Sequence, residues 1–287
     1  MKQISCAAKI VQKILHQECE SSHIRLSQAL GNFGHDQIEG IRGYRRAVKK
    51  IRCALLLTAG SLSAHERQKL DEQWVGLGRR LGYLRDMHAR EKKIYEIILS
   101  LPVAVQSEAL QALRNICGSV DNETNAAHRR EVLGSLTGDT ERLICITQSI
   151  GISNLTPTMV AGSVEHLWNR AHMRAQKSWD GRNEIWLHAL RKRVQRTHIA
   201  FRILRAQSGP RGLEIEKRLD AAAKAMGELR DISLLRTQCV AAPEFLHAHI
   251  LQTEIESTNN ARRLVTQAFK FNIAKALRFI TVSMHSA

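Results

Sequence analysis

The sequence is poor in proline, in aromatic residues and in long apolar runs. Four prolines occur among 287 residues, and aromatic residues make up 5% of the chain. Scarce proline leaves long helices uninterrupted, and few aromatic rings disfavour a protein that stacks many unpaired bases. No apolar run approaches the roughly 18 residues of a membrane-spanning helix, and the N-terminal stretch lacks an apolar block of signal-peptide length. We therefore expect no membrane insertion.

Recognisable catalytic and metal-binding motifs are also missing. The six cysteines are scattered with no Cys-x-x-Cys pair, which is typical of a reduced, cytoplasmic protein. His247 and His249 are separated by one residue, so a helix would point them to different sides, and we expect no metal site there. There is no Walker-type glycine loop and no Gly-x-Ser-x-Gly elbow. The sequence thus predicts no catalytic residue, no metal and no cofactor.

Acidic residues are too few to balance the basic ones. The chain has 43 Lys and Arg against 27 Asp and Glu, so its formal net charge is +16, and 13 His can add to that in mild acid. Such a surplus attracts nucleic acid, anionic membrane or another polyanion without indicating which.

Basic residues are concentrated in the stretch Leu187 to Arg205, which contains no Asp or Glu. At helical spacing, its apolar residues form one stripe that predicts packing on a core. The neighbouring stripe carries His188, Arg191, His198 and Arg202. Like charges three or four residues apart cost a helix roughly 0.2–0.5 kcal/mol per pair. A helix that keeps them indicates a polyanionic partner.

The same pattern occurs earlier in the chain, in the stretch from Ile41 to Leu55. An offset of 146 positions brings apolar residues onto apolar ones and basic residues onto basic ones. The sequence LGYLRD, which ends at Asp86, also matches MGELRD, which ends at Asp231, at an offset of 145. Two matches at nearly the same offset indicate internal duplication. We place the first half at residues 1–150 and the second at 151–287.

No segment shows sustained alternation of apolar and polar residues, so the sequence predicts an all-α fold without a sheet. We expect helix breaks near Gly118 and Gly138 and a lead-in helix of the second half from Val164 to Trp179. Duplicated helical halves would most simply meet about a pseudo-twofold axis, so the fold class predicted is a pair of duplicated helical-bundle halves related by such an axis.

The two basic stretches resemble the motif of the CHAD family, the conserved histidine α-helical domain, roughly His-x-x-Arg-x-x-x-(Arg/Lys)-(Arg/Lys)-x-Arg. The second stretch follows it at His188, Arg191, Arg196 and the position of His198, with Gln195 replacing one expected base; the first follows it at Arg45, Lys49, Lys50 and Arg52. Arg42 stands where the first stretch should have histidine, which keeps a cation and loses the pH-sensitive group. The resemblance covers about residues 15 to 285.

This resemblance implies a basic central cavity or groove between the two helical halves. It also implies a non-catalytic domain that binds inorganic polyphosphate there, for which phosphate or sulfate can substitute, and that associates with polyphosphate granules. By position in the motif and on the lead-in helix, the candidate ligands are Arg42, Arg45, Arg46, Lys49, Lys50, Arg52, Arg170, Arg174, His188, Arg191, Lys192, Arg196, His198 and Arg202. Asp86 and Asp231 are expected to cap a helix or to hold a basic side chain in position.

Two other hypotheses remain at this stage. A nucleic-acid-binding protein could use the same basic stripes, and an enzyme that transfers or hydrolyses phosphoryl groups would need acidic metal ligands beside them. The basic stretches contain no such ligands, so the enzyme is the less favoured of the two. The sequence leaves the oligomeric state open.

Overall fold

The computed structural model of the chain consists of α-helices joined by short connections. It describes residues 5–32, 34–117, 123–177, 179, 184–240 and 242–286, and gives the backbone alone at 34, 83–91, 117, 123–127, 184 and 286. Within these residues no strand occurs, and the helices are α1 (Cys6–Gly31), α2 (Gly34–Leu57), α3 (Ala64–Arg80), α4 (Gly82–Ser100), α5 (Val103–Cys117), α6 (Glu123–Gln148), α7 (Pro157–Lys177), α8 (Glu184–Ile203), α9 (Gly209–Gln238), α10 (Glu244–Phe269) and α11 (Ala274–Ser286). The predicted all-α fold is confirmed.

Two helices, α1 and α3, begin at serine side chains that cap them. The Ser5 hydroxyl accepts a hydrogen bond from the Ala8 amide at 3.1 Å at the start of α1. At α3, Ser63 and Glu66 form a reciprocal capping box. Each cap satisfies backbone amides that have no partner inside the helix.

Two helix boundaries differ from the sequence prediction. α6 runs through Gly138 without a break, and the prediction of a break there was wrong. A single glycine costs a helix only about 1 kcal/mol, which the buried side chains of Leu133, Leu136 and Leu143 can offset. α7 begins at Pro157, seven residues before Val164, because proline fits the first turn of a helix. The break expected near Gly118 falls outside the described residues.

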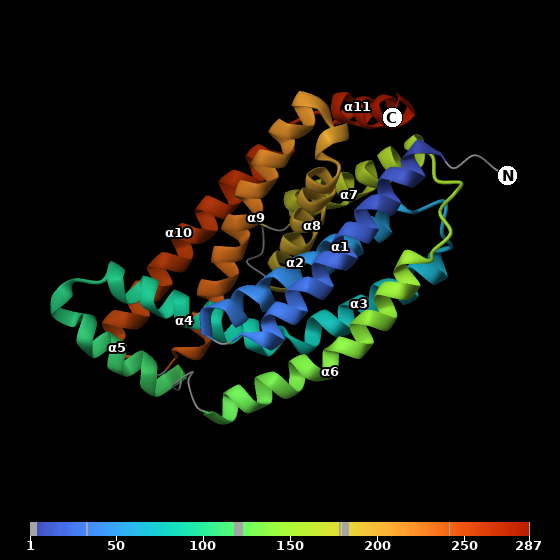
Figure 1. The fold of residues 1–287 in the computed structure, drawn as a ribbon. Helices are drawn as coiled ribbons and strands as arrows, with labels where there is room; N and C mark the ends of the chain where they lie inside the picture. Colours follow the sequence, from blue (N-terminus) through green and yellow to red (C-terminus); the bar gives the residue numbers. More distant parts are fainter. Residues whose placement is uncertain are drawn as a thin grey trace.

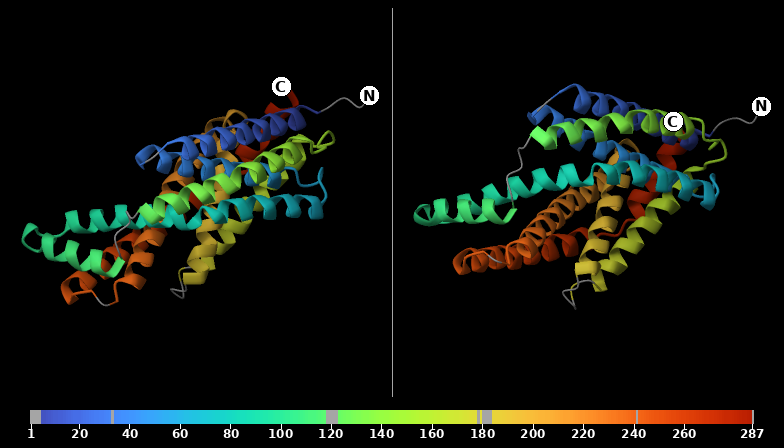
Figure 2. Two further views of the ribbon diagram at one scale, coloured as in Figure 1. Left: turned by 60° about the horizontal axis from the view of Figure 1, so that its bottom comes forward. Right: turned by 90° about the horizontal axis from the view of Figure 1, so that it is seen from below.

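The helices form two groups that meet along α2 and α8. In the first group α1 packs against α2 and α6, and in the second α9 packs against α8 and α10, while α7 packs against α8 and α11. Figure 2 shows α1, α3 and α6 on one side of the molecule and α7 to α10 on the other. α2 also contacts α8, and α4 contacts α9, so helices of the first group lie beside helices of the second (Figure 1).

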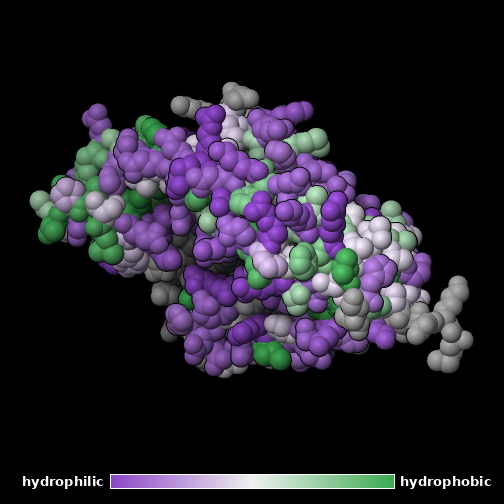
Figure 3. Space-filling model, turned by 90° about the horizontal axis from the view of Figure 1, so that it is seen from above, coloured by the Kyte–Doolittle hydropathy of each residue, from purple (hydrophilic) through white to green (hydrophobic). Residues whose placement is uncertain are grey.

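Apolar residues fill the interior of both groups and continue across the contact between them. The surface is mostly hydrophilic, and exposed hydrophobic side chains gather at the end of the molecule formed by α4, α5 and α10 (Figure 3). Leu99 and Val103, where α4 leads into α5, are 75% and 83% exposed. The origin of the two groups by duplication stays a prediction.

Candidate functional site

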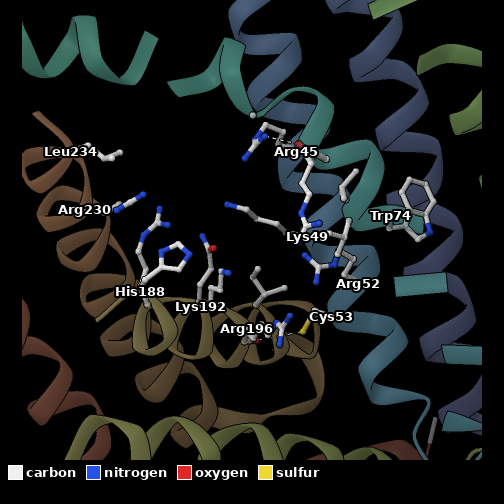
Figure 4. A pocket seen from close by; sticks show the side chains of 18 residues that line it. Arg45, Lys49, Arg52, Cys53, Trp74, His188, Lys192, Arg196, Arg230 and Leu234 are labelled. Carbon is white, nitrogen blue, oxygen red and sulfur yellow. Dashed lines mark hydrogen bonds between the residues drawn. The ribbon is translucent and has the colours of Figure 1, made fainter. Parts of the chain in front are cut away.

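The basic faces of α2 and α8 meet in a cavity of about 490 Å³ between the two helix groups. Figure 4 shows side chains from α2 and from α8 and α9 pointing into it from different sides. The lining contains Arg45, Val48, Lys49, Arg52, Cys53, Trp74, Val75, Gly78, Arg79, Gly82, His188, Arg191, Lys192, Gln195, Arg196, Ile199, Arg230 and Leu234. Eight of these are Lys or Arg, one is His, and no Asp or Glu is among the described lining residues.

The amphipathic pattern of α2 explains why its cations face the cavity. Ile41, Tyr44 and Val48 are buried, and the Tyr44 hydroxyl lies 2.9 Å from the Thr140 hydroxyl of α6. This stripe packs against the first helix group. The residue that follows a stripe residue in the sequence points to a different side of the helix, and here that side faces the second group. Lys49 therefore projects into the cavity (Figure 4).

α8 presents its basic stripe to the same cavity for the same reason. Leu190, Val194 and Phe201 are buried, which leaves His188 and Lys192, one helical turn apart, on the cavity wall. The two basic helices come into direct contact at one side of the cavity. There the Cys53 thiol of α2 donates to the Arg196 backbone carbonyl of α8 at 3.5 Å.

Two of the cavity arginines are held in place by other groups. The Arg45 guanidinium donates to the Gly78 carbonyl of α3 at 2.6 Å. Arg52 donates to both carboxylate oxygens of Asp71, also on α3, at 2.7 and 3.0 Å. This bidentate pair orients Arg52 and offsets part of its charge. Fixed donors bind an anion at a lower entropic cost than donors that must first be ordered.

Lys192 and Arg196 are repelled by neighbouring cations of the cavity. Burial and then Arg196 and Arg79 lower the pKa of Lys192. The pKa of Arg196 is lowered by burial and by Arg52. Each of these shifts means that the charged form is less favourable than in water. An anion in the cavity would remove this repulsion.

Arg79 and Arg230 line the cavity but were not predicted from the sequence. Arg79 belongs to α3, and Arg230 is the arginine of the second Leu-Arg-Asp element in α9. The repeated element was the available signal, but the prediction concerned its aspartates and not its arginine. Asp231 does not line the cavity, and the side chain of Asp86 lies outside the described residues.

Seven predicted ligands line the cavity and seven do not. The seven that line it are Arg45, Lys49, Arg52, His188, Arg191, Lys192 and Arg196. The seven outside it are Arg42, Arg46, Lys50, Arg170, Arg174, His198 and Arg202. Their role as ligands, for both sets, stays a prediction.

Most of the outlying cations have partners from the same chain. Arg42 pairs with Glu39 at 2.6 Å and Arg46 contacts the same carboxylate at 3.6 Å. These cations, with the hydrogen bond from Arg42 as the largest cause, keep the pKa of Glu39 below its usual value. Lys50 pairs with Glu18 of α1 at 2.8 Å. The basic residues of α2 therefore fall into two sets. One set lines the cavity, and the other lies beside it and pairs with carboxylates.

The second-half residues outside the cavity lie on other faces of α7 and α8. His198 is buried, and its Nε2 lies 3.4 Å from Asp220 of α9. Burial lowers the pKa of His198, and Asp220 opposes that shift. The Arg174 guanidinium stacks on the Trp186 ring at 3.9 Å, while Arg202 is exposed.

The described residues include no group of three or more His, Cys, Asp or Glu side chains placed to hold a metal ion. Nor does any helix, within the described chain, combine the length and hydropathy that crossing a bilayer requires. The chemistry that the cavity offers is a set of hydrogen-bond donors with positive charge, which suits phosphate oxygens.

Comparison with known proteins identifies the fold. The family model of the CHAD domain matches residues 25–240. PptA from Streptomyces chartreusis has a similar structure, with a TM-score of 0.66 and 13% sequence identity over 94% of this chain and 100% of that one. The CHAD domain from the plant Ricinus communis superposes with a TM-score of 0.60 and 17% identity over 100% of this chain and 94% of that one. No curated protein sequence matches. The chain belongs to the CHAD domain family.

Proposed function

We propose that the protein binds inorganic polyphosphate in the cavity between α2, α3, α8 and α9, without catalysing a reaction on it. One observation carries the proposal: eight Lys and Arg side chains and His188 line a single cavity whose described lining has no carboxylate. Polyphosphate is a flexible chain of evenly spaced anions, and cations about 5 Å apart along a helix can neutralise several in succession. Membership in the CHAD family supports the same ligand.

The arrangement of the cations favours binding over chemistry. Arginines from four helices, Arg45, Arg79, Arg191 and Arg230, can each present a planar fork to two phosphate oxygens. Phosphoryl transfer relies on metal ions held by carboxylates next to the phosphates, and the described lining supplies none. We further propose that the protein acts in the cytoplasm and associates with polyphosphate granules.

Binding should depend on salt and on chain length. If single-stranded nucleic acid is a fair guide, the logarithm of the affinity should fall with the logarithm of salt concentration, with a slope of about −0.7 per phosphate neutralised. Longer chains should bind more tightly until the cavity cations are all engaged. Titration of the protein with polyphosphates of graded length, at two NaCl concentrations, measures both effects.

A charge-reversal experiment tests whether the cavity is the site. The double variant Lys192→Glu with Arg196→Glu should weaken polyphosphate binding by about a hundredfold or more, because each change removes a charge-assisted contact worth about 1.5–3 kcal/mol. The matched control is Arg262→Glu with Arg263→Glu, which changes the net charge equally at two exposed positions of α10 outside the cavity.

The control variant should keep most of its affinity. Equal losses in both variants would show that only net charge matters, and unchanged binding in the cavity variant would place the site elsewhere. Nucleic acid is the alternative ligand. If excess short single- or double-stranded nucleic acid displaced polyphosphate at equal phosphate concentration, the preference for polyphosphate would be contradicted.

A further inference from the structure

His188 lies in the cavity wall among cations from two helices. It points into the cavity from α8, close to Arg230 of α9 (Figure 4). Its Nδ1 atom is buried and has no hydrogen-bond partner among the described residues. A buried ring nitrogen without a partner is rare in folded proteins and calls for an explanation, such as a bound ion or water.

The charged groups that face His188 are all positive in the described part of the chain. Arg191 and Lys192 come from its own helix, Arg230 comes from α9, and Arg45 and Lys49 line the cavity from α2. Of α4, which contacts α9, the side chains of residues 83–91 lie outside the description. Burial, followed by Lys192, Arg230 and Arg191, lowers the pKa of His188. The neutral form of the imidazole is therefore more favourable here than it is in water.

A phosphate chain in the cavity would reverse the local field. Burial disfavours the imidazolium, and so do the charges of Lys192, Arg230 and Arg191. The phosphate oxygens would offset these three charges and would accept hydrogen bonds from an imidazolium, which donates from both nitrogens. We propose that His188 is a proton-linked ligand, which takes up a proton from solvent as a polyphosphate chain binds and contacts that chain as the imidazolium. This inference rests on the proposed function and adds to it that the affinity responds to pH.

The coupling between proton uptake and polyphosphate binding should involve a single residue of the protein. Every other cation of the described lining is Lys or Arg. Lys192 has a pKa shifted in the same direction, but from an ordinary value of 10.5, compared with 6.5 for His188. The residue that matches the family histidine in the first half is Arg42, which pairs with Glu39 and lies outside the cavity. Proton uptake attributable to the cavity should therefore lie between zero and one per bound chain.

Calorimetric titration with long-chain polyphosphate, at one pH near 7 and in two buffers of different ionisation enthalpy, measures the number of protons taken up. Terminal phosphates have a second ionisation near pH 6 and would exchange protons themselves. Long chains have few of them for each internal phosphate, so this contribution stays small. The wild-type protein should take up more protons than His188→Gln, and the difference should approach one. His188→Arg, which keeps the charge without titrating, should bind but show the same uptake as His188→Gln.

The affinity of the wild type should rise as pH falls from 8 to 5.5, by about tenfold for each unit by which binding raises the pKa of His188. That of His188→Arg should rise less. The control His172→Gln changes a histidine outside the cavity and should keep the wild-type uptake. Equal uptake in the wild type and in His188→Gln would overturn the inference while leaving the proposed function intact. Failure of the wild type to bind polyphosphate at low salt would instead contradict the proposed function.

Discussion

At the scale of single residues, partners from neighbouring helices decide which cations remain available to a ligand. Asp71 of α3 holds Arg52 in a bidentate pair with both side chains about one quarter exposed. Lys192 and Arg196 make no ion pair with a carboxylate in the described part of the chain. The basic residues of one stripe are therefore unequal, although their spacing along the helix is regular.

Asp71→Asn should strengthen polyphosphate binding several-fold and lower stability slightly. The change removes a carboxylate that competes with phosphate for Arg52, while the asparagine oxygen can keep one hydrogen bond. Loss of a partly exposed ion pair should cost about 1 kcal/mol or less. Binding is measured by titration at low salt, and stability by urea unfolding.

The matched control is Asp139→Asn, because Asp139 pairs with Arg80 at 2.7 Å outside the cavity. This variant raises the net charge equally and should change the affinity much less. If the two variants gained affinity equally, the Arg52–Asp71 pair would have no special influence on the site.

At the scale of elements, the orientation of α2 depends on how closely it approaches α1. A Cβ atom at Gly40 would lie 2.7 Å from the Ala29 backbone nitrogen and 2.8 Å from its Cα. Only glycine fits this crossing, because the backbone of α1 cannot move aside as a flexible side chain can. The crossing fixes α2, and with it the row of cations that faces the cavity.

Gly40→Ala should destabilise the protein by about 1–3 kcal/mol, the usual range for an overpacked interior, and should also weaken polyphosphate binding. Urea unfolding and ligand titration of the same sample measure the two effects. Gly76→Ala in α3 is the control, since a Cβ there meets nothing within 4 Å. It should stabilise the protein by about 0.5–1 kcal/mol. A neutral or stabilising effect of Gly40→Ala would contradict the close crossing.

At the scale of the whole molecule, the net charge of +16 and the gathering of cations in one cavity produce repulsion that the fold must overcome. Two groups of helices, each with its own buried residues, are brought together at α2 and α8. The contact encloses cations from both groups in one cavity. Association of the groups is therefore opposed by electrostatics, and anions should favour it.

Long-chain polyphosphate should raise the melting temperature at low NaCl concentration, and the effect should diminish in 1 M NaCl. Binding to the folded state alone would add about 2.7 kcal/mol when free ligand is at 100 times its Kd. The variant Lys192→Glu with Arg196→Glu should show little of this rise, yet should melt at a higher temperature than the wild type without ligand, because repulsion is relieved. A lower melting temperature of the variant at low salt would show that the cavity cations do not oppose folding.

The sequence alone predicted the helical class, the two basic helices and the family resemblance, because apolar and basic residues repeat with the period of a helix. It also predicted seven of the residues that line the cavity, among them His188 and Arg196. Those features depend on local spacing, which a helix of 3.6 residues per turn converts directly into faces. The prediction of a break at Gly138 was wrong because burial of neighbouring leucines in the tertiary structure stabilises α6, and the local sequence does not indicate that burial.

Only the tertiary structure decided which basic residues share the cavity. Arg79 and Arg230 join it because α3 and α9 pack beside the basic helices. Lys50 is left out, with its charge balanced by Glu18 of α1 at 2.8 Å. Helix periodicity assigns a residue to a face, but the charge that remains on that face depends on side chains brought from distant parts of the sequence.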